Sequence, residues 1–377
     1  MRWLFWFSAG FLAYTFLGYR AVLWMLARRR GGLRRRADTW PTVSLIIAGH
    51  NVAKIIRAKL ENTLQLAYPR DKLEIVVASD RSEDATAEIV RGFANRGVKL
   101  IETAERRGKH HAQMLARDAS RGEILVFTDA SVLLEPSSLR KMIENFADRS
   151  VGVVSSEDDA GRKQTHGAGE SSYVRSEMEL RRLESQVASA VSASGSFFGA
   201  RQEVCARWHP DRSSDFFVPL HAVAQGFRVV VEPECRAHLA VVQSDRAEFH
   251  RKVRTIVHGL DVLFSHLALL NPFRHGLFSW QLASHKLFRW LLPYALAALL
   301  LSNIFICGAH PFYRLVLVLQ ICGYVAGTLA LLVKGWADFR PLRLAAFFLI
   351  GNAATVVAWV KFSRGERYVV WEPSQRP

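Results

Sequence analysis

The apolar segments at the two ends of the chain constrain its fold more than any other feature. Residues 3–26 are apolar over a length that can cross a bilayer, with tryptophans towards both ends. Three segments near the other end are of the same kind: residues 287–307, 313–333 and 342–360. A backbone that lies in lipid must bond to itself, so each of these segments is expected to be a membrane helix. The first is too long for a signal peptide, and its positive charges follow it rather than precede it.

The charges beside the first segment predict how the chain lies in the membrane. Six arginines stand between residues 28 and 36, directly after it. Because cytoplasmic loops carry the excess of Lys and Arg, we expect the N-terminus outside and everything after Arg36 in the cytoplasm. This describes an integral protein of the inner or plasma membrane with a cytoplasmic domain. The net charge of +16 calls for an anionic partner, and a basic run beside a membrane span favours anionic lipid over nucleic acid.

The last apolar segment creates a conflict with this charge rule. Three crossings after a cytoplasmic domain would leave the end of the chain outside, yet Lys361, Arg364 and Arg367 make that end positive. Either the tail is an exception, or one apolar segment enters the membrane without crossing it. Gly351-Asn352 in the last segment would allow such re-entry, and the sequence leaves both possibilities open.

Residues 41–243 have the pattern of an α/β domain. Short apolar runs, which are expected to be buried strands, alternate with stretches that are expected to be helices. The expected strands are residues 43–47, 73–78, 98–101 and 124–127, and the helices between them are residues 55–66, 86–95 and 109–120. This alternation predicts a doubly wound, mostly parallel sheet. The four cysteines show neither a metal-type spacing nor a disulfide framework, which fits a reducing compartment.

Polar or small residues follow three of the expected strands. They are Ala48-Gly49-His50-Asn51, Ser79-Asp80 and Asp129-Ala130-Ser131. Open parallel sheets bind ligands in the crevice at the carboxyl ends of their strands, so these endings predict a shared ligand crevice. Taken alone, each carboxylate could equally be a turn or helix-cap residue. Neither a Gly-x-Gly-x-x-Gly loop nor a P-loop follows the first strand, so a nucleotide would bind there by other means.

Six pieces of the sequence, taken in order, resemble family 2 glycosyltransferases with the GT-A fold. They are VSLIIAGHN (43–51), EIVVASDRSEDAT (74–86), RRGKHHAQM (106–114), EILVFTDASVLLEP (123–136), SGSFFGARQEV (194–204) and SSDFFVPLHAVAQGFRVVVEPE (213–234). No single piece is specific, but the ordered set is. The resemblance implies an α/β fold of the GT-A type, flanked by transmembrane and interfacial helices. It also implies an inverting, hexosyltransferase-type enzyme that moves a sugar from a nucleotide-sugar, in particular a UDP-sugar, to a lipid or polysaccharide acceptor.

The resemblance assigns donor-side roles to residues near the strand ends. Asp80 matches the carboxylate that contacts the base and ribose, and Lys109 matches a cation beside the sugar donor, with Asn51 in the same nucleotide-sugar-binding set. Asp129 matches the first acid of an Asp-x-Asp motif that holds Mg²⁺ or Mn²⁺ against the diphosphate. The second acid is replaced here by Ser131. We therefore expect a divalent metal at Asp129 and Ser131, bound more weakly than by two acids.

The resemblance also assigns residues near the acceptor. Asp215 matches the catalytic base, which removes the proton of the attacking hydroxyl in a single displacement. Gly195 and Ser196 match a stretch that lines the acceptor site. Arg251 and Arg254 fall where processive members carry Gln-x-x-Arg-Trp, and Arg254 alone matches that pattern. We assign Arg254 to the donor and Arg251 to the acceptor side, and we expect transfer of single sugars.

Three other functions stay open on the sequence. The chain could be a processive polysaccharide synthase, or a nucleotidyltransferase, although the glycine-rich loop of that class is missing. It could also be a non-catalytic membrane protein that binds nucleotide or lipid through a degenerate site, an alternative that Ser131 favours. The predicted parts are a membrane helix (1–27), a basic linker (28–40), a GT-A catalytic domain (41–243), basic and interfacial helices (244–286), membrane helices (287–362) and a tail (363–377).

Overall fold

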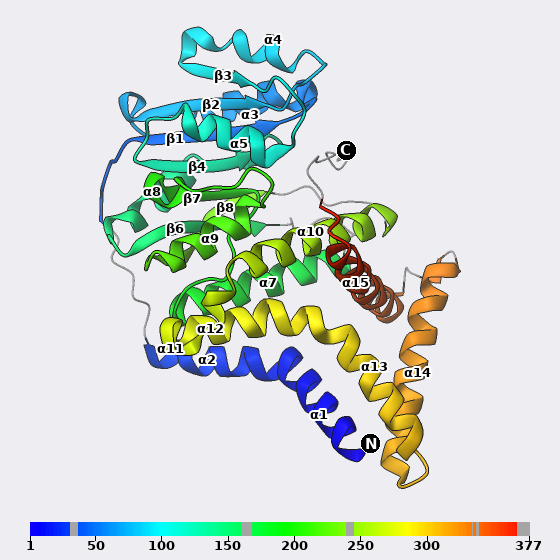
Figure 1. Cartoon of the computed structure of the whole chain (residues 1–377). Coiled ribbons are helices and arrows are strands. Elements are labelled where there is room, and N and C mark those ends of the chain that lie inside the picture. The colour runs from blue at the N-terminus through cyan, green and yellow to red at the C-terminus, as the bar shows by residue number, and fades with distance from the viewer. Residues whose placement is uncertain (31–36, 160–167, 239–244, 334, 337–338, 368–377) are drawn as a thin grey trace.

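The computed structural model consists of an α/β domain and an arm of long helices (Figure 1). It describes residues 1–30, 37–159, 168–238, 245–333, 335–336 and 339–367. Residues 31–36, which hold three of the six arginines of the basic run, and the end of the tail therefore lie outside the described residues. The arm extends away from the domain and contains α1 (Arg2–Ala13), α13 (Phe288–Ile306) and α14 (Pro311–Leu332).

One eight-stranded sheet forms the centre of the domain. The strands are β1 (Val43–Gly49), β2 (Leu73–Ser79), β3 (Val98–Glu102), β4 (Ile124–Asp129), β5 (Leu133–Leu134), β6 (Val151–Asp159), β7 (Phe197–Arg201) and β8 (Arg228–His238), in the order β3-β2-β1-β4-β7-β6-β8-β5. The four strands expected from the sequence form the parallel half, with β1 between β2 and β4. β6 also pairs in parallel with β8, whereas β7 is antiparallel to both its neighbours and β5 to β8. The sheet is thus mixed, and the expected α/β class is confirmed.

Helices cover both faces of this sheet, and apolar side chains on both faces of the strands are buried against them. The domain helices are α3 (Ala53–Thr63), α4 (Thr86–Arg91), α5 (Lys109–Asp118), α6 (Ser138–Ile143), α8 (Gln202–Cys205) and α9 (Ser214–Ala224), with 3₁₀ turns η2 (Arg70–Lys72), η3 (Ala94–Arg96) and η4 (Glu144–Ala147). Along β1, Leu45 and Ile47 belong to a core with α3 and α6, while Ile46 and Ala48 belong to a second core with α5 and α9. Such alternation is the period of a strand that is buried on both sides.

Several helices join the domain to the arm. They are α7 (Ala168–Val187), α10 (Asp245–Ser265), α11 (Pro272–His275) and α12 (Leu277–Leu282), with the 3₁₀ turn η6 (Leu267–Leu270). The sequence predicted interfacial helices at 244–286. In the structure, Val262, Leu263, Phe278 and Leu282 are buried in the second core, so this region packs on the domain.

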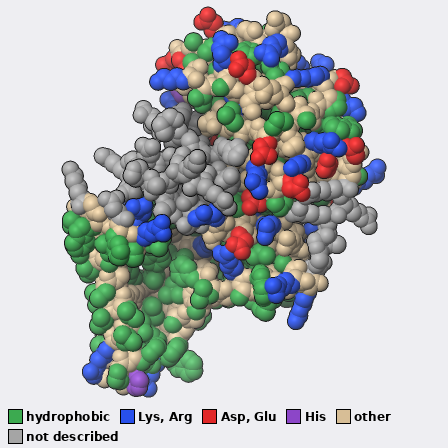
Figure 2. All heavy atoms as spheres, turned by 180° about the vertical axis from the view of Figure 1, so that it is seen from behind, with side chains coloured by type: hydrophobic (Ala, Val, Ile, Leu, Met, Phe, Trp, Pro, Cys, Tyr) green, Lys and Arg blue, Asp and Glu red, His purple; other side chains and the backbone are tan. Residues whose placement is uncertain are grey.

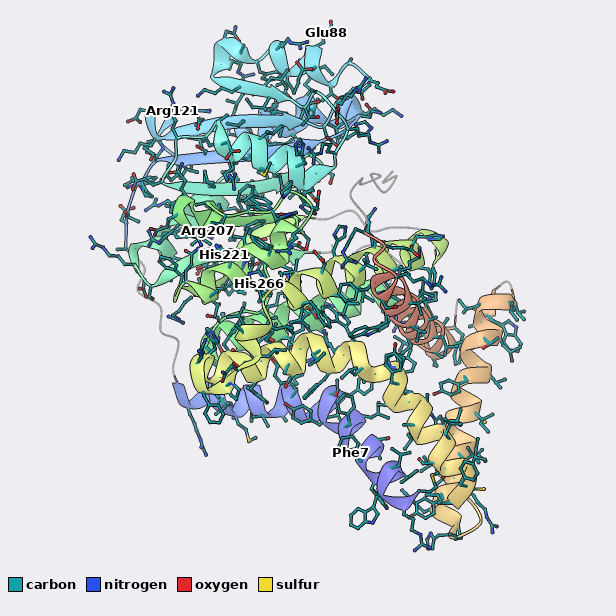
Figure 3. The ribbon with its side chains drawn as sticks, in the orientation of Figure 1. Phe7, Glu88, Arg121, Arg207, His221 and His266 are labelled. Atoms are coloured by element: carbon teal, nitrogen blue, oxygen red, sulfur yellow. The ribbon has the colours of Figure 1, made fainter. Side chains whose placement is uncertain are left out.

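The arm is built from long apolar helices. Besides α1, α13 and α14 it contains α2 (Tyr19–Arg30), α15 (Arg340–Ser363) and two π-helical turns, η1 (Tyr14–Gly18) and η7 (Ala283–Leu287). Among the described residues, four helical stretches are long and apolar enough to cross a membrane: Arg2–Arg29, Leu277–Ile306, Pro311–Leu332 and Arg340–Ser363. Hydrophobic side chains gather over the arm, whereas charged ones are scattered over the domain (Figure 2). Phe7, 74% exposed on α1, and Glu88 on α4 lie at opposite ends of the molecule (Figure 3).

Candidate active site

The three polar strand endings meet at one edge of the sheet. In the register of the parallel half, Gly49 of β1 lies opposite Ser79 of β2, and Ala48 lies opposite Asp129 of β4. The carboxyl ends of β1, β2 and β4 therefore stand side by side. The three polar endings are therefore neighbours, as a shared ligand crevice requires, and the crevice itself stays a prediction.

Lys109 and Asp129 form an ion pair at this edge. The Lys109 ammonium meets Asp129 Oδ1 and also donates to the carbonyl oxygen of Gly195, at 3.0 Å. Gly108, just before Lys109, has φ +90°, a conformation that glycine adopts readily, and it lets the chain turn into α5 with Lys109 as its first residue. One cation thus joins the end of β4 to the segment before β7.

Lys59 supports the turn that carries Asp129. Its side chain is fully buried, and its ammonium donates to Val132 O at 2.5 Å and to Thr128 Oγ1 at 3.1 Å. Burial lowers the pKa of Lys59 to about 7, although the charge of Asp129 acts in the opposite direction. The sequence did not indicate this residue, since an isolated lysine in a helix is usually solvated.

Asp80 holds the loop that leads into α5. Its carboxylate is 2% exposed and accepts hydrogen bonds from the backbone N–H groups of Arg107, at 3.0 Å, and Gly108, at 2.8 Å. The Thr103 hydroxyl donates to the same carboxylate at 3.3 Å. Asp80 therefore positions the backbone next to Lys109, and its predicted contact with a base and ribose stays a prediction.

Asn51 joins the ends of β1 and β2. It adopts φ +53°, which asparagine tolerates better than most residues. Its side-chain oxygen accepts from Glu83 N at 2.8 Å, and its own N–H donates to Ser82 Oγ at 3.1 Å. Asn51 thus keeps two loops of the crevice together.

Asp215 lies in the first turn of α9, and its surroundings are fixed by neighbouring elements. The N–H of Ser214 donates to His110 Nδ1 at 3.3 Å, and the Ser214 hydroxyl donates to Gln113 Oε1 at 3.0 Å, so α5 holds the start of α9. The carbonyl oxygen of Asp215 accepts from Ala193 N at 2.8 Å. A Cβ atom on Gly195 would lie only 3.1 Å from Asp215 Oδ2.

Gly195 and Ser196 therefore lie between the predicted base, Asp215, and the predicted donor-side residues, Lys109 and Asp129. Gly195 adjoins the Asp215 carboxylate and accepts from Lys109, while Ser196 O accepts from Asp129 N at 3.1 Å. Ser196 is itself buried, with its hydroxyl 2.6 Å from that of Ser194. The structure thus brings Lys109, Asp129, Asp215 and the segment before β7 into one connected set.

Two histidines, which the sequence did not indicate as site residues, lie beside Asp215. The rings of His110 on α5 and His258 on α10 are 6.1 Å apart. Burial, followed by the charges of Lys109, His258 and Arg254, holds the pKa of His110 well below its ordinary value. Burial and Arg254 also lower the pKa of His258, against the opposing charge of Asp215. In the sequence, the position of His110 directly after Lys109 could have indicated that this histidine belongs to the site.

These electrostatic effects also place Arg254 near the site, because its charge acts on both rings. Arg251 lies one turn earlier on α10, and Ser131 lies in the turn after β4. Their predicted roles stay predictions.

A hollow of about 190 Å³ adjoins this set of residues. It is lined by His209, Asp211, Arg212, Val257, His258, Asp261 and Arg367. Asp261 is paired on both sides, with Arg212 at 3.2 Å and with Arg367 at 3.0 Å. The end of the described chain thus returns to the neighbourhood of Asp215.

The residues available for a metal are few. Among the described residues, no group of three or more His, Cys, Asp or Glu side chains is arranged to hold one. Asp129 and Ser131 offer a carboxylate and a hydroxyl in one turn. Mg²⁺ is commonly held by one or two carboxylates together with waters and substrate phosphates. The donor set therefore fits a cation that arrives with a diphosphate, and does not fit one held by the protein alone.

The family of this domain follows from comparison with known proteins. Residues 44–207 match the model of glycosyl transferase family 2. These residues form a family 2 glycosyltransferase domain. The match includes Asp80, Lys109, Asp129, Ser131, Gly195 and Ser196, whereas Asp215, Arg251 and Arg254 lie beyond it.

Curated relatives of the glycosyltransferase domain are found in several bacteria. The chain is 35% identical over 102 residues to the probable glycosyltransferase YdaM of Bacillus subtilis, over 26% of this chain and 24% of that protein. The chain is also 25% identical over 215 residues to the beta-monoglucosyldiacylglycerol synthase of Trichormus variabilis, over 53% of this chain and 45% of that protein. The chain thus spans less than half the length of these relatives.

A solved structure resembles nearly the whole chain. The mannosyltransferase PcManGT from Pyrobaculum calidifontis, in complex with GDP-Man and Mn²⁺, matches with a TM-score of 0.72 and 24% identity, over 97% of this chain and 100% of that one. This likeness shows that the two share a fold. Together with the family match, it confirms the expected GT-A type of the glycosyltransferase domain.

Proposed function

We propose that this protein is a membrane-bound inverting glycosyltransferase, which moves a sugar from a nucleotide-sugar to a lipid or glycan acceptor at the cytoplasmic face of the membrane. The observation that carries the proposal is the connected set of Lys109, Asp129, Gly195 and Asp215 at the carboxyl edge of a glycosyltransferase sheet. The apolar arm joined to this domain supports an acceptor that is presented at a membrane surface.

On the donor side, the residues of the chain would bind the diphosphate through their charge and would position the nucleoside. Lys109 would bind the diphosphate as a point charge, and Asp80 and Asn51 would shape the nucleoside pocket through the loops that they hold. Asp129 and Ser131 would hold Mg²⁺ or Mn²⁺, which neutralises charge on the departing nucleoside diphosphate. The Mn²⁺ in the PcManGT complex supports this choice of cations.

On the acceptor side, Asp215 acts as the general base. It takes the proton from the acceptor hydroxyl while that oxygen attacks the anomeric carbon. The bond from this carbon to the acceptor oxygen forms as the bond to the phosphate oxygen breaks, which inverts the configuration in one step. Gly195 and Ser196 would bound the space in which the acceptor lies, and Arg251 would contact it.

The nucleotide of the donor is the least constrained part of the proposal. The sequence resemblance favours a UDP-sugar, whereas the complex of PcManGT holds GDP-Man. Both nucleotides therefore belong in the same test.

The proposed position of the domain on the cytoplasmic side of the membrane rests on the charges of the chain. Arg28 and Arg29 lie in the last turn of α2, at the end of that helix from which the chain continues to the domain, and positive residues favour the cytoplasmic side. The same residues would bind anionic lipid headgroups.

The experiment is a measurement of nucleoside diphosphate release by the purified full chain in detergent. The protein is given UDP- and GDP-sugars with Mn²⁺ and a lipid extract as acceptor. We expect release with at least one donor, loss of release in Asp129→Ala, and a fall of roughly 10²- to 10⁴-fold in Asp215→Asn. Asp71→Asn serves as the matched control, because Asp71 is exposed in η2 at the opposite edge of the sheet.

The outcomes separate this function from its alternatives. Unchanged release in Asp215→Asn would remove that residue as the base. Long products from labelled donor would indicate a processive synthase, and donor binding without release would indicate a non-catalytic protein.

A further inference from the structure

A buried carboxylate on α7 connects the membrane helices to the domain. Glu184 is fully buried, and its Oε1 accepts from the hydroxyl of Tyr19 on α2 at 2.6 Å and lies 2.6 Å from His285 Nδ1 in η7. Its other oxygen, Oε2, accepts from the backbone N–H of Val191 at 3.1 Å. One side chain thus contacts two helices of the arm and the segment that follows α7.

Glu177, two turns earlier on α7, strengthens the same junction. Its carboxylate lies 2.7 Å from His285 Nε2 and accepts from Arg289 Nη1 at 2.7 Å. Burial alone would raise the pKa of Glu177, but His285 and Arg289 outweigh it and hold this pKa well below its ordinary value. The junction is therefore ionic, and its two carboxylates and His285 are buried, which favours one fixed geometry.

The segment Val191–Ser196 continues from this junction into the site. On one side, Val191 N bonds to Glu184, and Arg181 donates to Ala193 O at 3.0 Å. On the other side, the contacts are Ala193 N to Asp215 O, Lys109 Nζ to Gly195 O and Asp129 N to Ser196 O. The same six residues are thus fixed by α7 at one end and contact all three proposed reaction residues at the other.

We propose that Glu184 is a positioning residue for sugar transfer: through Val191 it fixes the segment 191–196 against Asp215, and through Tyr19 and His285 it makes this geometry depend on the docking of the membrane helices. The inference rests on the proposed function. Because Glu184 touches neither Asp215 nor Lys109, its effect passes through the backbone of the segment. A small displacement of reacting groups is enough to lower a rate strongly.

The test uses two variants of the full chain in detergent. Glu184→Gln keeps the volume of the side chain but cannot accept from all three donors, and Tyr19→Phe removes only the hydroxyl from α2. Tyr68→Phe is the matched control, because the Tyr68 hydroxyl makes a hydrogen bond of the same length, 2.6 Å, to Pro41 O, away from α7. For each protein, kcat, the KM and Kd of the donor, and the melting temperature are measured.

We expect kcat to fall at least 10-fold in Glu184→Gln and about 3- to 10-fold in Tyr19→Phe, at a temperature where both are folded, with the donor Kd changed less than 2-fold. Tyr68→Phe is expected to lower the melting temperature with kcat unchanged.

The inference is overturned if the Glu184→Gln and Tyr19→Phe enzymes turn over at the wild-type rate, or if Tyr68→Phe loses as much kcat as Tyr19→Phe. It is also overturned if donor affinity falls in step with kcat. If Glu184→Gln does not fold, the comparison of Tyr19→Phe with Tyr68→Phe decides. Absence of release by the wild-type protein would instead contradict the proposed function.

Discussion

At the scale of single residues, His110 shows how a site side chain takes its chemistry from its neighbours. Its Nδ1 accepts from Ser214 N, and this nitrogen can accept only when it carries no proton. Burial and the charges of Lys109 and Arg254 keep the ring neutral by lowering its pKa. Since Ser214 precedes Asp215, protonation of His110 would disturb the start of the helix that carries the proposed base.

This arrangement predicts a pH dependence of stability. The pKa of His110 is lower in the folded chain than in the unfolded chain, so between these two values the unfolded state binds the additional proton. The contribution of His110 to the free energy of unfolding is therefore complete above about pH 6.5, the ordinary pKa of histidine, and it is lost as the pH falls below that value. We expect His110→Asn, which retains an oxygen acceptor without titrating, to lose less melting temperature between pH 8 and pH 5.5 than the wild type. Parallel pH profiles would contradict this.

Gly195 gives a second prediction at this scale. A Cβ at this position would lie 3.1 Å from Asp215 Oδ2, so the carboxylate must move by a few tenths of an ångström. We expect Gly195→Ala to lower kcat by roughly 3- to 10-fold with little change in melting temperature, because the contact concerns one partly exposed side chain. Gly323→Ala in α14, where a Cβ meets nothing within 4 Å, is the control. An unchanged kcat in Gly195→Ala would show that the Asp215 carboxylate need not stay where it lies.

The sequence predicted the residues at strand ends and missed those that support them. Asp80 and Asp129 were visible because each stands at the end of an apolar run, one polar residue after it. Lys59 was not visible, because its partners Thr128 and Val132 lie 69 and 73 residues further along the chain. Glu184 was hidden for the same reason, with partners in α2 and η7. A local sequence pattern therefore predicts which side chains stand at the ends of the strands. The residues that hold them in place are brought there by tertiary packing, which the local pattern does not contain.

At the scale of elements, the parallel half of the sheet was predicted well. Its strands are continuous apolar runs, each separated by a helix, and their boundaries agree within about two residues with the expected ones. The other half was not predicted, since β6 and β8 pair with register shifts and β5 has only two residues. Irregular pairing of this kind gives no periodic signal.

The two π-helical turns were also beyond prediction, and they lie next to each other. The Tyr14 hydroxyl in η1 lies 2.7 Å from Ser284 Oγ in η7 and accepts from Trp280 Nε1 at 2.7 Å. Turns of this type bend helices, and α2 and α12 lie beneath the domain while α1 and α13 extend away from it (Figure 1). The pair of turns therefore lies where α1 bends away from α2 and where α13 bends away from α12.

Tyr14→Phe tests this junction. It leaves the Ser284 hydroxyl and the Trp280 N–H without their shared partner, which we expect to cost about 1–3 kcal/mol of unfolding free energy. The melting temperature in detergent, followed by tryptophan fluorescence, should fall. Tyr294→Phe is the control, since that side chain is 45% exposed on α13. Equal melting temperatures for the two variants would mean that the hydroxyl contributes nothing to the junction.

At the scale of the whole molecule, the packing of α15 gives a prediction for the side on which the tail lies. Although α15 is apolar enough to cross a membrane, it packs along α10: Ala354 and Ala358 share a cluster with Val253 and Val257 of that helix. Just beyond α15, Arg367 pairs with Asp261 of α10. Since α10 also packs into the domain core, we expect α15 to lie along the membrane surface without crossing. The positive tail then stays on the side of the domain, as its charge requires.

Cysteine labelling in sealed membrane vesicles tests this topology. In a chain whose four native cysteines are replaced, single cysteines are placed at Arg364 after α15, at Arg121 on the domain and at Ala309 between α13 and α14; all three positions are exposed. If α15 does not cross, an impermeant maleimide should label positions 364 and 121 from the same side and position 309 from the other. Labelling of positions 364 and 309 from the same side would show that α15 crosses and that the Arg367–Asp261 pair does not form in the membrane. The outcome matters for the site, because Arg367 lines the hollow beside His258 only when the tail stays with the domain.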